Sequence, residues 1–347
     1  MATIAQSMLE AIESELQRQV GRLDQPRTQQ FHEMLTYHMG WTGEGAGSLA
    51  AGKRIRPLLT LLSTASVNNE ERVSNNIVNL NYWLRAKSAA ASIELIHNFS
   101  LVHDDIQDNS DLRRGRRTVW VKWGVPMAIN VGDAMFVIAN QAILDLVEYY
   151  PADMVVKAAR ILNDCCLDLT RGQFLDMSYE ERDDLTLEDY WPMIGGKTSA
   201  LLSACTHIGS LLGYAKDKQQ EAYRLFGYHL GLAFQVQDDL LGIWGNESLT
   251  GKSVASDLVE GKNSLPVLFA LGKNGKFAER WRRGPIPLDE VRHVSTLLED
   301  EGGRSFAETV AEEETQKALG YLKQANPCGE AGEAMLELAN MLLKRKQ

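Results

Sequence analysis

YWLRAKSAAASIELIHNFSLVHDDIQ, residues 82–107, carries the pattern that decides the fold of this chain. Apolar or small residues recur in it at steps of three and four, which places them on one face of a long helix. They are Leu84, Ser88, Ala91, Leu95, Phe99 and Val102. Such a stripe predicts a helix that packs its apolar face against other helices.

The same spacing continues on both sides of this stretch. Helical patterns cover residues 126–147, 153–177, 197–213, 217–243, 305–324 and 330–345. Strand signals are scarce, because few runs alternate Val, Ile and Thr with polar residues and no Asn-Gly turn joins two such runs. The sequence therefore predicts an all-α protein.

Glycine, proline and polar residues interrupt the helical patterns at 42–54, 110–118 and 244–266. None of these segments has the length or the low complexity of an interdomain linker. We therefore expect residues 1–347 to form one domain, a single large helical bundle with its functional loops at one end. The core that bears the motifs spans about residues 50–270, and the helices of 275–347 are expected to belong to the same domain.

The 347 residues carry a formal net charge of −10, so the surface as a whole repels phosphate backbones and anionic membranes. Nucleic acid is therefore not an expected partner. The four cysteines form no CxxC pair. The N-terminal segment 1–23 mixes acidic with apolar residues, unlike a secretory signal. These features predict a cytoplasmic protein.

One segment without formal charge, residues 198–215, approaches the ~20 residues that cross a bilayer. Six of its eighteen residues are Thr, Ser or His. A helix that is buried on all sides in a large bundle also loses its polar face. We therefore expect a buried helix here and no transmembrane segment.

Four aspartates and four arginines fall within residues 103–117. Asp104 and Asp108 would share a helix face, with Asp105 beside them and Asp111 next in line if the helix continued. Like charges at this spacing destabilise a helix by roughly 0.2–0.5 kcal/mol per pair, so a cation is expected among them. Carboxylate ligands without Cys or His favour Mg²⁺ over Zn²⁺. The alternative is a solvated acidic helix end that the nearby arginines neutralise.

A second acidic cluster favours the metal site. The segment FQVQDDLLG, residues 234–242, places four positions on one helical face: Gln235, Asp238, Asp239 and Gly242. Paired aspartates in a buried helix are costly unless their charge is matched. Two facing helices that each present a carboxylate pair inside a bundle form a ready cavity for several divalent ions. We expect the active-site cavity there, between core helices.

Cations accompany both clusters. The segment GKRIRP contains Lys53, Arg54 and Arg56, the segment GGKTS places Lys197 and Thr198 at a helix start, and the loop 244–266 adds Lys252 and Lys262. A helix start with free backbone N–H groups and a lysine is a natural anion site. Together with the acidic helices, these cations indicate ligands with two separate phosphate groups, one held through metal and one held directly.

Five segments, in this order, resemble the trans-isoprenyl diphosphate synthases across roughly residues 50–270: GKRIRP, ELIHNFSLVHDDIQDNSDLRRGRRT, GKTSAL, FQVQDDLLG and GKSVASDLVEGKNSLP. The order and spacing make the resemblance specific, whereas a lone DDIQD also fits type I terpene cyclases. The resemblance implies an all-α bundle of the isoprenoid synthase type, usually a homodimer. It further implies head-to-tail joining of isopentenyl diphosphate to dimethylallyl, geranyl or farnesyl diphosphate.

The resemblance also implies roles for single residues. Asp104 and Asp108, with Asp105 beside them, would bind two Mg²⁺ ions on the allylic diphosphate, and Asp238 would bind a third. The allylic site would further contain Arg113, Lys197, Gln235, Asp239, Lys252 and Lys262, and Thr198 would shield the allylic cation. Isopentenyl diphosphate would be held by Lys53, Arg56, His97 and Arg114. The departing diphosphate would accept the proton, so no side-chain base is needed.

The family pattern gives two finer expectations. Its second motif usually reads DDxxD, whereas this chain has Gly242 in the fifth position, which predicts retained activity with weaker metal binding. Asp257 is expected to supply negative charge behind the metal ligands. Phe99 and Ser100, five and four residues before Asp104, resemble C20-type synthases, so the expected product is geranylgeranyl diphosphate. The alternative is that other residues, or a dimer partner, close the pocket that limits the length of the product.

Two other functions stay open. A type I terpene cyclase would also use Mg²⁺ and an aspartate-rich helix, but it would not need a second diphosphate site. A non-catalytic subunit that binds a prenyl diphosphate in a heteromeric synthase is favoured by Gly242 alone.

Overall fold

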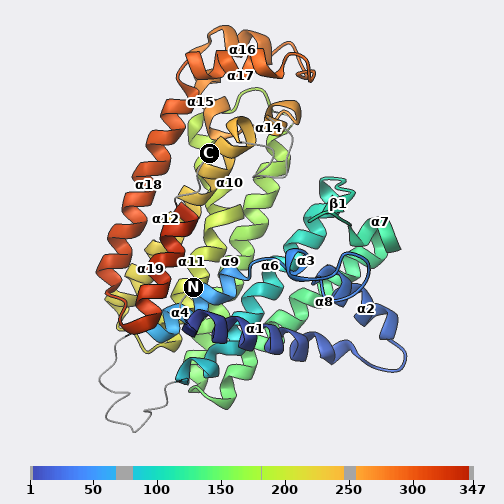
Figure 1. Ribbon diagram of the computed structural model, residues 1–347, viewed down its shortest axis with the longest axis vertical. Helices are drawn as coiled ribbons and strands as arrows, with labels where there is room; N and C mark the ends of the chain where they lie inside the picture. The colour runs from blue at the N-terminus through green and yellow to red at the C-terminus, as the bar shows by residue number, and fades with distance from the viewer. Residues whose placement is uncertain (1–2, 68–80, 181, 246–254, 344–347) are drawn as a thin grey trace. The chain divides into compact units, whose positions relative to one another are not determined.

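The computed structural model describes residues 3–67, 81–180, 182–245 and 255–343 (Figure 1). Across these ranges the chain is almost entirely helical, and a single two-stranded hairpin is the only sheet. The prediction of an all-α protein is therefore confirmed, and each predicted helical pattern lies on an observed helix.

The elements, with 3₁₀ and π turns named η, are α1 (Thr3–Val20), η1 (Gly21–Leu23), α2 (Gln29–His38), α3 (Ser48–Ala51), α4 (Ile55–Ser66), η2 (Tyr82–Ala86), α6 (Lys87–Gln107), β1 (Leu112–Arg113), β2 (Arg116–Arg117), α7 (Val119–Trp123), α8 (Val125–Leu144), η3 (Asp145–Glu148), α9 (Ala152–Tyr179), α10 (Leu187–Ile194), η4 (Gly195–Ser199), α11 (Ala200–Leu212), α12 (Asp217–Trp244), α14 (Ser256–Val259), α15 (Leu265–Lys273), α16 (Lys276–Trp281), α17 (Val291–Asp300), α18 (Gly303–Ala325) and α19 (Gly329–Leu343). Strands β1 and β2 pair antiparallel, with Leu112 opposite Arg117 and Arg113 opposite Arg116.

The chain separates into two compact units. The first comprises Met1–Asn163, Ala204–Glu221 and Asn326–Met335, and the second comprises Asp164–Ser203, Ala222–Ala325 and Leu336–Gln347. The expectation of one domain over residues 1–347 stays a prediction.

Helix α6 is the central helix of the first unit, and it packs against α1, α4 and α8 (Figure 1). Its fully buried residues are mostly small or apolar: Ala89, Ala90, Ala91, Ser92, Ile93, Leu95 and Ile96. The hydroxyl of Ser92 donates a hydrogen bond to the carbonyl oxygen of Ala139 on α8 at 2.7 Å. Small residues on α6 therefore allow α8 to approach closely. Of the predicted stripe, Ser88, Ala91, Leu95 and Val102 are buried, but Leu84 is exposed, and the buried residues of α6 extend beyond a single face.

Helix α6 ends at Gln107, and the chain then forms the hairpin β1–β2. The hairpin turn consists of Arg114 and Gly115, which both have positive φ, as the two-residue turns that suit hairpins require. The sequence predicts only a loop at 110–118, so this short sheet is an addition. Because the helix does not continue, Asp111 does not join the helical face of the acidic cluster.

Helices α10, α12, α15 and α18 contribute to one apolar cluster in the second unit. Its buried members are Tyr190, Ile194, Leu232, Val236, Leu240, Leu265, Leu268, Ala307, Val310 and Ala311. Val236 and Leu240, on either side of the acidic pair in sequence, therefore anchor this part of α12 in the core. A further apolar cluster joins the end of α12 to α14, α15, α16 and α17.

The turn η4 lies directly against α9 within the second unit. A Cβ at Gly196 would lie 2.6 Å from the carbonyl oxygen of Asp168, and one at Gly172 would lie 2.1 Å from the backbone nitrogen of Lys197. Only glycine permits this approach of two backbones. The two glycines therefore fix the place at which Lys197 and Thr198 enter α11.

The uncharged segment 198–215 corresponds mainly to α11, whose apolar residues Leu201, Leu202, Cys205 and Ile208 are buried. The expectation of a buried helix there is confirmed. A different stretch of the described chain, Val125–Glu148, is long and apolar enough to cross a membrane by length and composition, and 44% of its apolar window is buried. Core helices of proteins outside membranes meet the same criteria.

Candidate active site

Three aspartates gather at the C-terminal end of α6. The backbone N–H of Asp108 donates to the carbonyl oxygen of Asp104 at 2.8 Å, so the two residues are one helical turn apart. Asp104 is half-buried, Asp108 is exposed, and Asp105 is only 1% exposed. The C-terminal end of a helix carries partial negative charge, so acidic side chains there create a potential that a cation relieves. The local geometry therefore suits a cation at Asp104 and Asp108.

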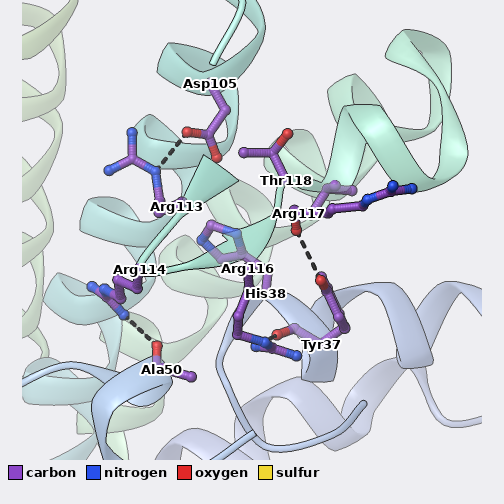
Figure 2. A pocket seen from close by; sticks show the side chains of 10 residues that line it. Tyr37, His38, Ala50, Asp105, Arg113, Arg114, Arg116, Arg117 and Thr118 are labelled. Atoms are coloured by element: carbon purple, nitrogen blue, oxygen red, sulfur yellow. Dashed lines mark hydrogen bonds and ion pairs between the residues drawn. The ribbon is translucent and has the colours of Figure 1, made fainter. Parts of the chain in front are cut away.

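Asp105 points toward a protein cation (Figure 2). Its Oδ1 accepts a hydrogen bond from Nε of Arg113 at 2.6 Å, and its buried Oδ2 has no hydrogen-bond partner among the described residues. Burial raises the pKa of Asp105 to about 6, although Arg113 acts in the opposite direction. Its predicted place among the metal ligands stays a prediction, and its observed partner is the hairpin that follows α6.

Two other arginines of the hairpin, Arg114 and Arg116, bind backbone carbonyl oxygens, whereas Arg113 pairs with Asp105. Arg116 donates to the carbonyl oxygens of Tyr37, Thr42 and Glu44 at 2.7–2.9 Å, and its guanidinium lies 4.0 Å from the centre of the Tyr37 ring. All three acceptors are backbone atoms, so Arg116 fastens the segment after α2 to the hairpin. Arg114 donates to the carbonyl oxygen of Ala50 at 2.7 Å. The acidic cluster therefore shares its immediate surroundings mainly with Arg113.

Two residues predicted for isopentenyl diphosphate are in contact in the first unit. Nη1 of Arg56 lies 3.2 Å from Nε2 of His97. Burial and the charges of Arg56, Arg114 and Arg113 lower the pKa of His97 well below its ordinary value, so the ring is neutral near pH 7 and accepts from arginine. Lys53 is exposed at the start of the same segment. These groups form a cationic region with one neutral imidazole, which suits a diphosphate.

Arg54 serves the fold instead. Its side chain is 5% exposed and forms ion pairs with Glu94 at 2.9 Å and Glu13 at 3.2 Å. Two carboxylates therefore hold the first turn of α4 against α6 and α1. The sequence analysis placed Arg54 among the cations near the phosphate ligands. In the structure its side chain is buried and pairs with two glutamates instead.

His38, at the end of α2, is a neighbour of this cationic region that the sequence did not single out. It lines a small pocket with Asp105, Arg113 and Arg114, whose volume of about 20 Å³ holds roughly one water molecule (Figure 2). Its Nε2 is buried with no hydrogen-bond partner among the described residues. Burial, assisted by Arg113 and Arg114, lowers the pKa of His38 to about 3. No local signal marks it, because residues distant in sequence create the pocket.

The second acidic pair lies on α12. Asp239 is 6% exposed and accepts three hydrogen bonds: from the hydroxyl of Tyr190 at 2.7 Å, from the backbone N–H of Leu265 at 2.9 Å and from Nε2 of Gln235 at 3.0 Å. Burial raises its pKa to about 6 despite these donors. Leu265 begins α15, so the carboxylate also occupies a helix N-terminus. Asp238, the preceding residue, is half-buried.

Gln235 links Asp239 to the turn η4. The hydroxyl of Thr198 donates to Oε1 of Gln235 at 2.7 Å, while Nε2 of Gln235 donates to Asp239. Lys197 forms an ion pair with Asp176 on α9. Four predicted residues are therefore brought together within the second unit. Asp176 was missed, although its place in the segment GQFLD, where Gly172 meets η4, is a signal that could have found it.

Gly242 is buried on α12, and the side chain of Asp257 lies against it. Asp257 is 5% exposed, and Nζ of Lys262 lies 3.5 Å from its Oδ1 and 2.6 Å from Oε2 of Glu260. The predicted Lys252 lies outside the described residues.

Phe99 and Ser100 lie one turn before the acidic cluster on α6, and both are half-buried. The Phe99 ring contacts Phe136 on α8 edge-on, with ring centroids 5.3 Å apart, and His103 at 5.6 Å. The hydroxyl of Ser100 donates to the carbonyl oxygen of His97 at 2.9 Å. Phe99 of α6 and Phe136 of α8 therefore form an aromatic pair one turn before Asp104, where the residue that limits product length was expected.

Within the described ranges, no group of three or more His, Cys, Asp or Glu side chains is gathered closely enough to hold a metal ion alone. Asp104 and Asp108 belong to the first unit, and Asp238 belongs to the second. Mg²⁺ usually takes one or two carboxylates and completes its shell with water and phosphate oxygens. Asp104 and Asp108, one helical turn apart, therefore fit Mg²⁺ in company with a phosphate ligand.

Comparisons with known proteins identify the family of the chain. Residues 46–285 match the sequence model of the polyprenyl synthetase family. Two relatives come from Mycobacterium tuberculosis strain H37Rv. A (2E,6E)-farnesyl diphosphate synthase is 33% identical over 97% of this chain and 91% of its own length, and a geranylgeranyl diphosphate synthase is 37% identical over 84% and 81%.

The fold is similar to a solved structure as well. The crystal structure of a polyprenyl synthetase from Streptomyces coelicolor A3(2) has a TM-score of 0.84 and 32% identity, with 99% of each chain covered. The expected bundle of the isoprenoid synthase type is therefore confirmed.

Proposed function

Because the chain belongs to the polyprenyl synthetase family and is a trans-prenyltransferase, we propose that it joins isopentenyl diphosphate to an allylic diphosphate and releases geranylgeranyl diphosphate. Prenyltransferases of this family use these two kinds of diphosphate and are known as Mg²⁺-dependent. The C20 product, the roles of single residues and the number of ions are the finer parts of the proposal.

Asp104 and Asp108 at the end of α6 and Asp238 on α12 would together hold three Mg²⁺ ions on the allylic diphosphate, with Asp105 beside the first two. When bound, the ions neutralise the charge that develops on the departing diphosphate. Arg113, Lys197 and Lys262 would add fixed positive charge to the same group, as would Lys252.

Gln235 and Thr198 would position the allylic chain. Their mutual hydrogen bond and the bond from Gln235 to Asp239 restrict both side chains to one arrangement. Asp239 is then assigned to support of the site, because its oxygens already accept three hydrogen bonds. Preorganised dipoles of this kind stabilise a cation without a reorganisation cost.

The observation that carries the proposal is the contact of Arg56 with a neutral His97 beside Arg113 and Arg114. With Lys53, these residues would hold isopentenyl diphosphate directly, without metal. A terpene cyclase acts on one diphosphate and has no use for such a second anion site. Neither a cyclase nor a non-catalytic subunit gains support from the relatives.

The proposed product length rests on the aromatic pair of Phe99 and Phe136, which is expected to close the far end of the chain-binding pocket. Relatives that make C15 and C20 products are both similar to this chain, so they do not decide the length. An aromatic residue five positions before Asp104 and the small Ser100 after it favour the C20 product.

A homodimer is part of the proposal, and we propose the cytoplasm as its location. In the first unit α8 and η3 expose large apolar side chains, among them Val137 at 54%, Leu144 at 55% and Val147 at 63%. Contiguous exposed apolar residues favour burial against a partner surface. Sedimentation of the purified protein tests this part: a monomer at micromolar concentration would contradict it.

The test of the whole proposal is an assay of purified protein with isopentenyl diphosphate, Mg²⁺ and each of dimethylallyl, geranyl and farnesyl diphosphate. Mass spectrometry of the products is expected to show a C20 diphosphate. Hydrocarbon release from the allylic diphosphate alone would indicate a cyclase. No turnover with any primer would indicate a non-catalytic subunit.

A further inference from the structure

Gly242 lies inside α12, four residues after Asp238 and on the same helical face. A glycine inside a helix is less stable than alanine by roughly 0.5–1 kcal/mol, so its presence calls for a local reason. The resemblance described above leads one to expect a carboxylate at this position. The structure shows what occupies the space.

The carboxyl group of Asp257 fills the place that a side chain at position 242 would need. A Cβ on Gly242 would lie 1.9 Å from Oδ2, 2.4 Å from Cγ and 2.9 Å from Oδ1 of Asp257. Real Cβ contacts of this kind do not occur below about 3 Å, because van der Waals repulsion rises steeply there. A side chain at 242 and the observed carboxylate of Asp257 therefore exclude each other.

Asp257 is held where it is by its own short helix. It lies in α14, it is 5% exposed, and its carbonyl oxygen accepts from the backbone N–H of Lys262 at 2.9 Å. The ammonium of Lys262 is nearer to Glu260 than to Asp257. Burial is the main cause of the raised pKa of Asp239, and the negative charge of Asp257 adds to it. The carboxylate of Asp257 therefore acts on the acidic face of α12.

We propose that Asp257 supplies, from α14, the carboxylate that the acidic motif of α12 lacks at Gly242, and that it positions the cation held by Asp238. The inference rests on the proposed function, in which Asp238 is a metal ligand. Side chains four residues apart on a helix have Cβ atoms about 5–6 Å apart. Because the carboxyl group of Asp257 occupies the Cβ position of residue 242, this spacing would allow it to act on a cation held by Asp238 through bound water.

The first test uses Gly242→Asp, which completes the motif in sequence but displaces Asp257 in space. The affinity for inorganic pyrophosphate in the presence of Mg²⁺, measured by calorimetry, is expected to fall about tenfold or more, as when a group behind a metal ligand is lost. The melting temperature is expected to fall as well. The matched control is Gly320→Asp, because Gly320 lies in the middle of α18 and a Cβ there meets nothing within 4 Å.

The double variant Gly242→Asp with Asp257→Gly provides the rescue. It moves the carboxylate from α14 back to α12, so its pyrophosphate affinity is expected to return to within about threefold of the wild type, a non-additivity typical of residues in contact. Asp257→Asn keeps the shape and removes the charge, and it is expected to weaken Mg²⁺-dependent binding about tenfold without lowering the melting temperature.

The inference is overturned if the double variant binds no better than Gly242→Asp, or if Asp257→Asn binds pyrophosphate with wild-type Mg²⁺ dependence. Asp238→Asn separates this failure from failure of the proposed function. If Asp238→Asn keeps wild-type binding and turnover, the proposed function fails. If it loses both while the Asp257 variants match the wild type, only the role of Asp257 is wrong.

Discussion

The end of α6 and the end of α12 carry the same sequence pattern, a pair of adjacent aspartates, and stabilise it in different ways. On α6 the second aspartate, Asp105, pairs with an arginine from the following hairpin. On α12 the second aspartate, Asp239, accepts hydrogen bonds from three neutral donors and is buried. What the pairs share is the first aspartate, half-buried in both cases. The difference teaches that the same sequence pattern is stabilised by a charged partner on α6 and by neutral donors on α12.

The largest expected effect concerns those shared first aspartates. Asp104→Asn and Asp238→Asn are each expected to lower Mg²⁺-dependent turnover by about a thousandfold, because each removes a charged ligand from the departing diphosphate. Steady-state rates with isopentenyl and farnesyl diphosphates measure the effect. Asp300→Asn, at an exposed aspartate at the end of α17, is the control and should leave the rate unchanged. Full Mg²⁺-dependent turnover in Asp238→Ala would break the comparison.

The second aspartates are expected to differ in their contribution to stability. Asp239→Ala leaves the buried Tyr190 hydroxyl and Leu265 N–H without their acceptor, which should lower the free energy of unfolding by about 2–3 kcal/mol. Asp105→Ala leaves Arg113, whose side chain is 31% exposed and can be hydrated, so about 1 kcal/mol is expected. Urea denaturation measures both values. Equal losses would show that the two pairs are stabilised alike.

The surroundings of the α6 end are expected to respond to acid through His38. Its folded pKa of about 3 lies below its ordinary value of 6.5, so the unfolded chain binds a proton that the folded chain refuses. The free energy of unfolding therefore falls as the pH decreases from 6.5, and His38→Gln should remove about 3 kcal/mol of that fall by pH 4.5. Denaturation at pH 7.5 and pH 4.5 measures it. The exposed His293→Gln serves as control, and an equal change in both variants would refute the role of burial.

The smallest expected effect concerns the aromatic residues one helical turn before each aspartate pair, and it is seen in the chain length of the product. Phe99→Ala removes an aromatic ring that contacts Phe136 and should shift the product towards longer chains. Phe234→Ala, at the corresponding turn of α12, should leave the chain length unchanged. Chromatography of the released prenyl alcohols measures both. An unchanged C20 product in Phe99→Ala would show that another residue limits the product length, and Phe136 would be the first to test.

Much of the fold was predictable, because it depends on local periodicity. Helical spacing of apolar residues predicted α6, α8, α9, α12 and α18, although α6 is buried on more sides than its stripe indicated. The acidic pairs were recognisable because carboxylates recur at helical spacing. Thr198 and Gln235 were found as separate signals, and the structure joins them by a hydrogen bond that only the fold creates.

The use of each charge was not predictable from local sequence. Arg54 and Arg116 resemble ligand-binding arginines in sequence, yet one pairs with two glutamates and the other with three backbone carbonyls. Asp257 was expected to supply charge, but its position against Gly242 depends on a contact between two helices. Such pairings join residues that are distant along the chain, and no periodicity encodes them.

The central proposal is that Asp104, Asp108 and Asp238 are ligands of the metal ions bound to the allylic diphosphate. Crystals grown with Mn²⁺ and inorganic pyrophosphate, with the ions located by anomalous scattering, test it most directly. The account predicts ions on a single pyrophosphate, with carboxylate oxygens of Asp104 and Asp108 and of Asp238 at coordination distances near 2 Å. Ions bound at only one of the two helices, with Asp238 directed away from the pyrophosphate, would contradict it.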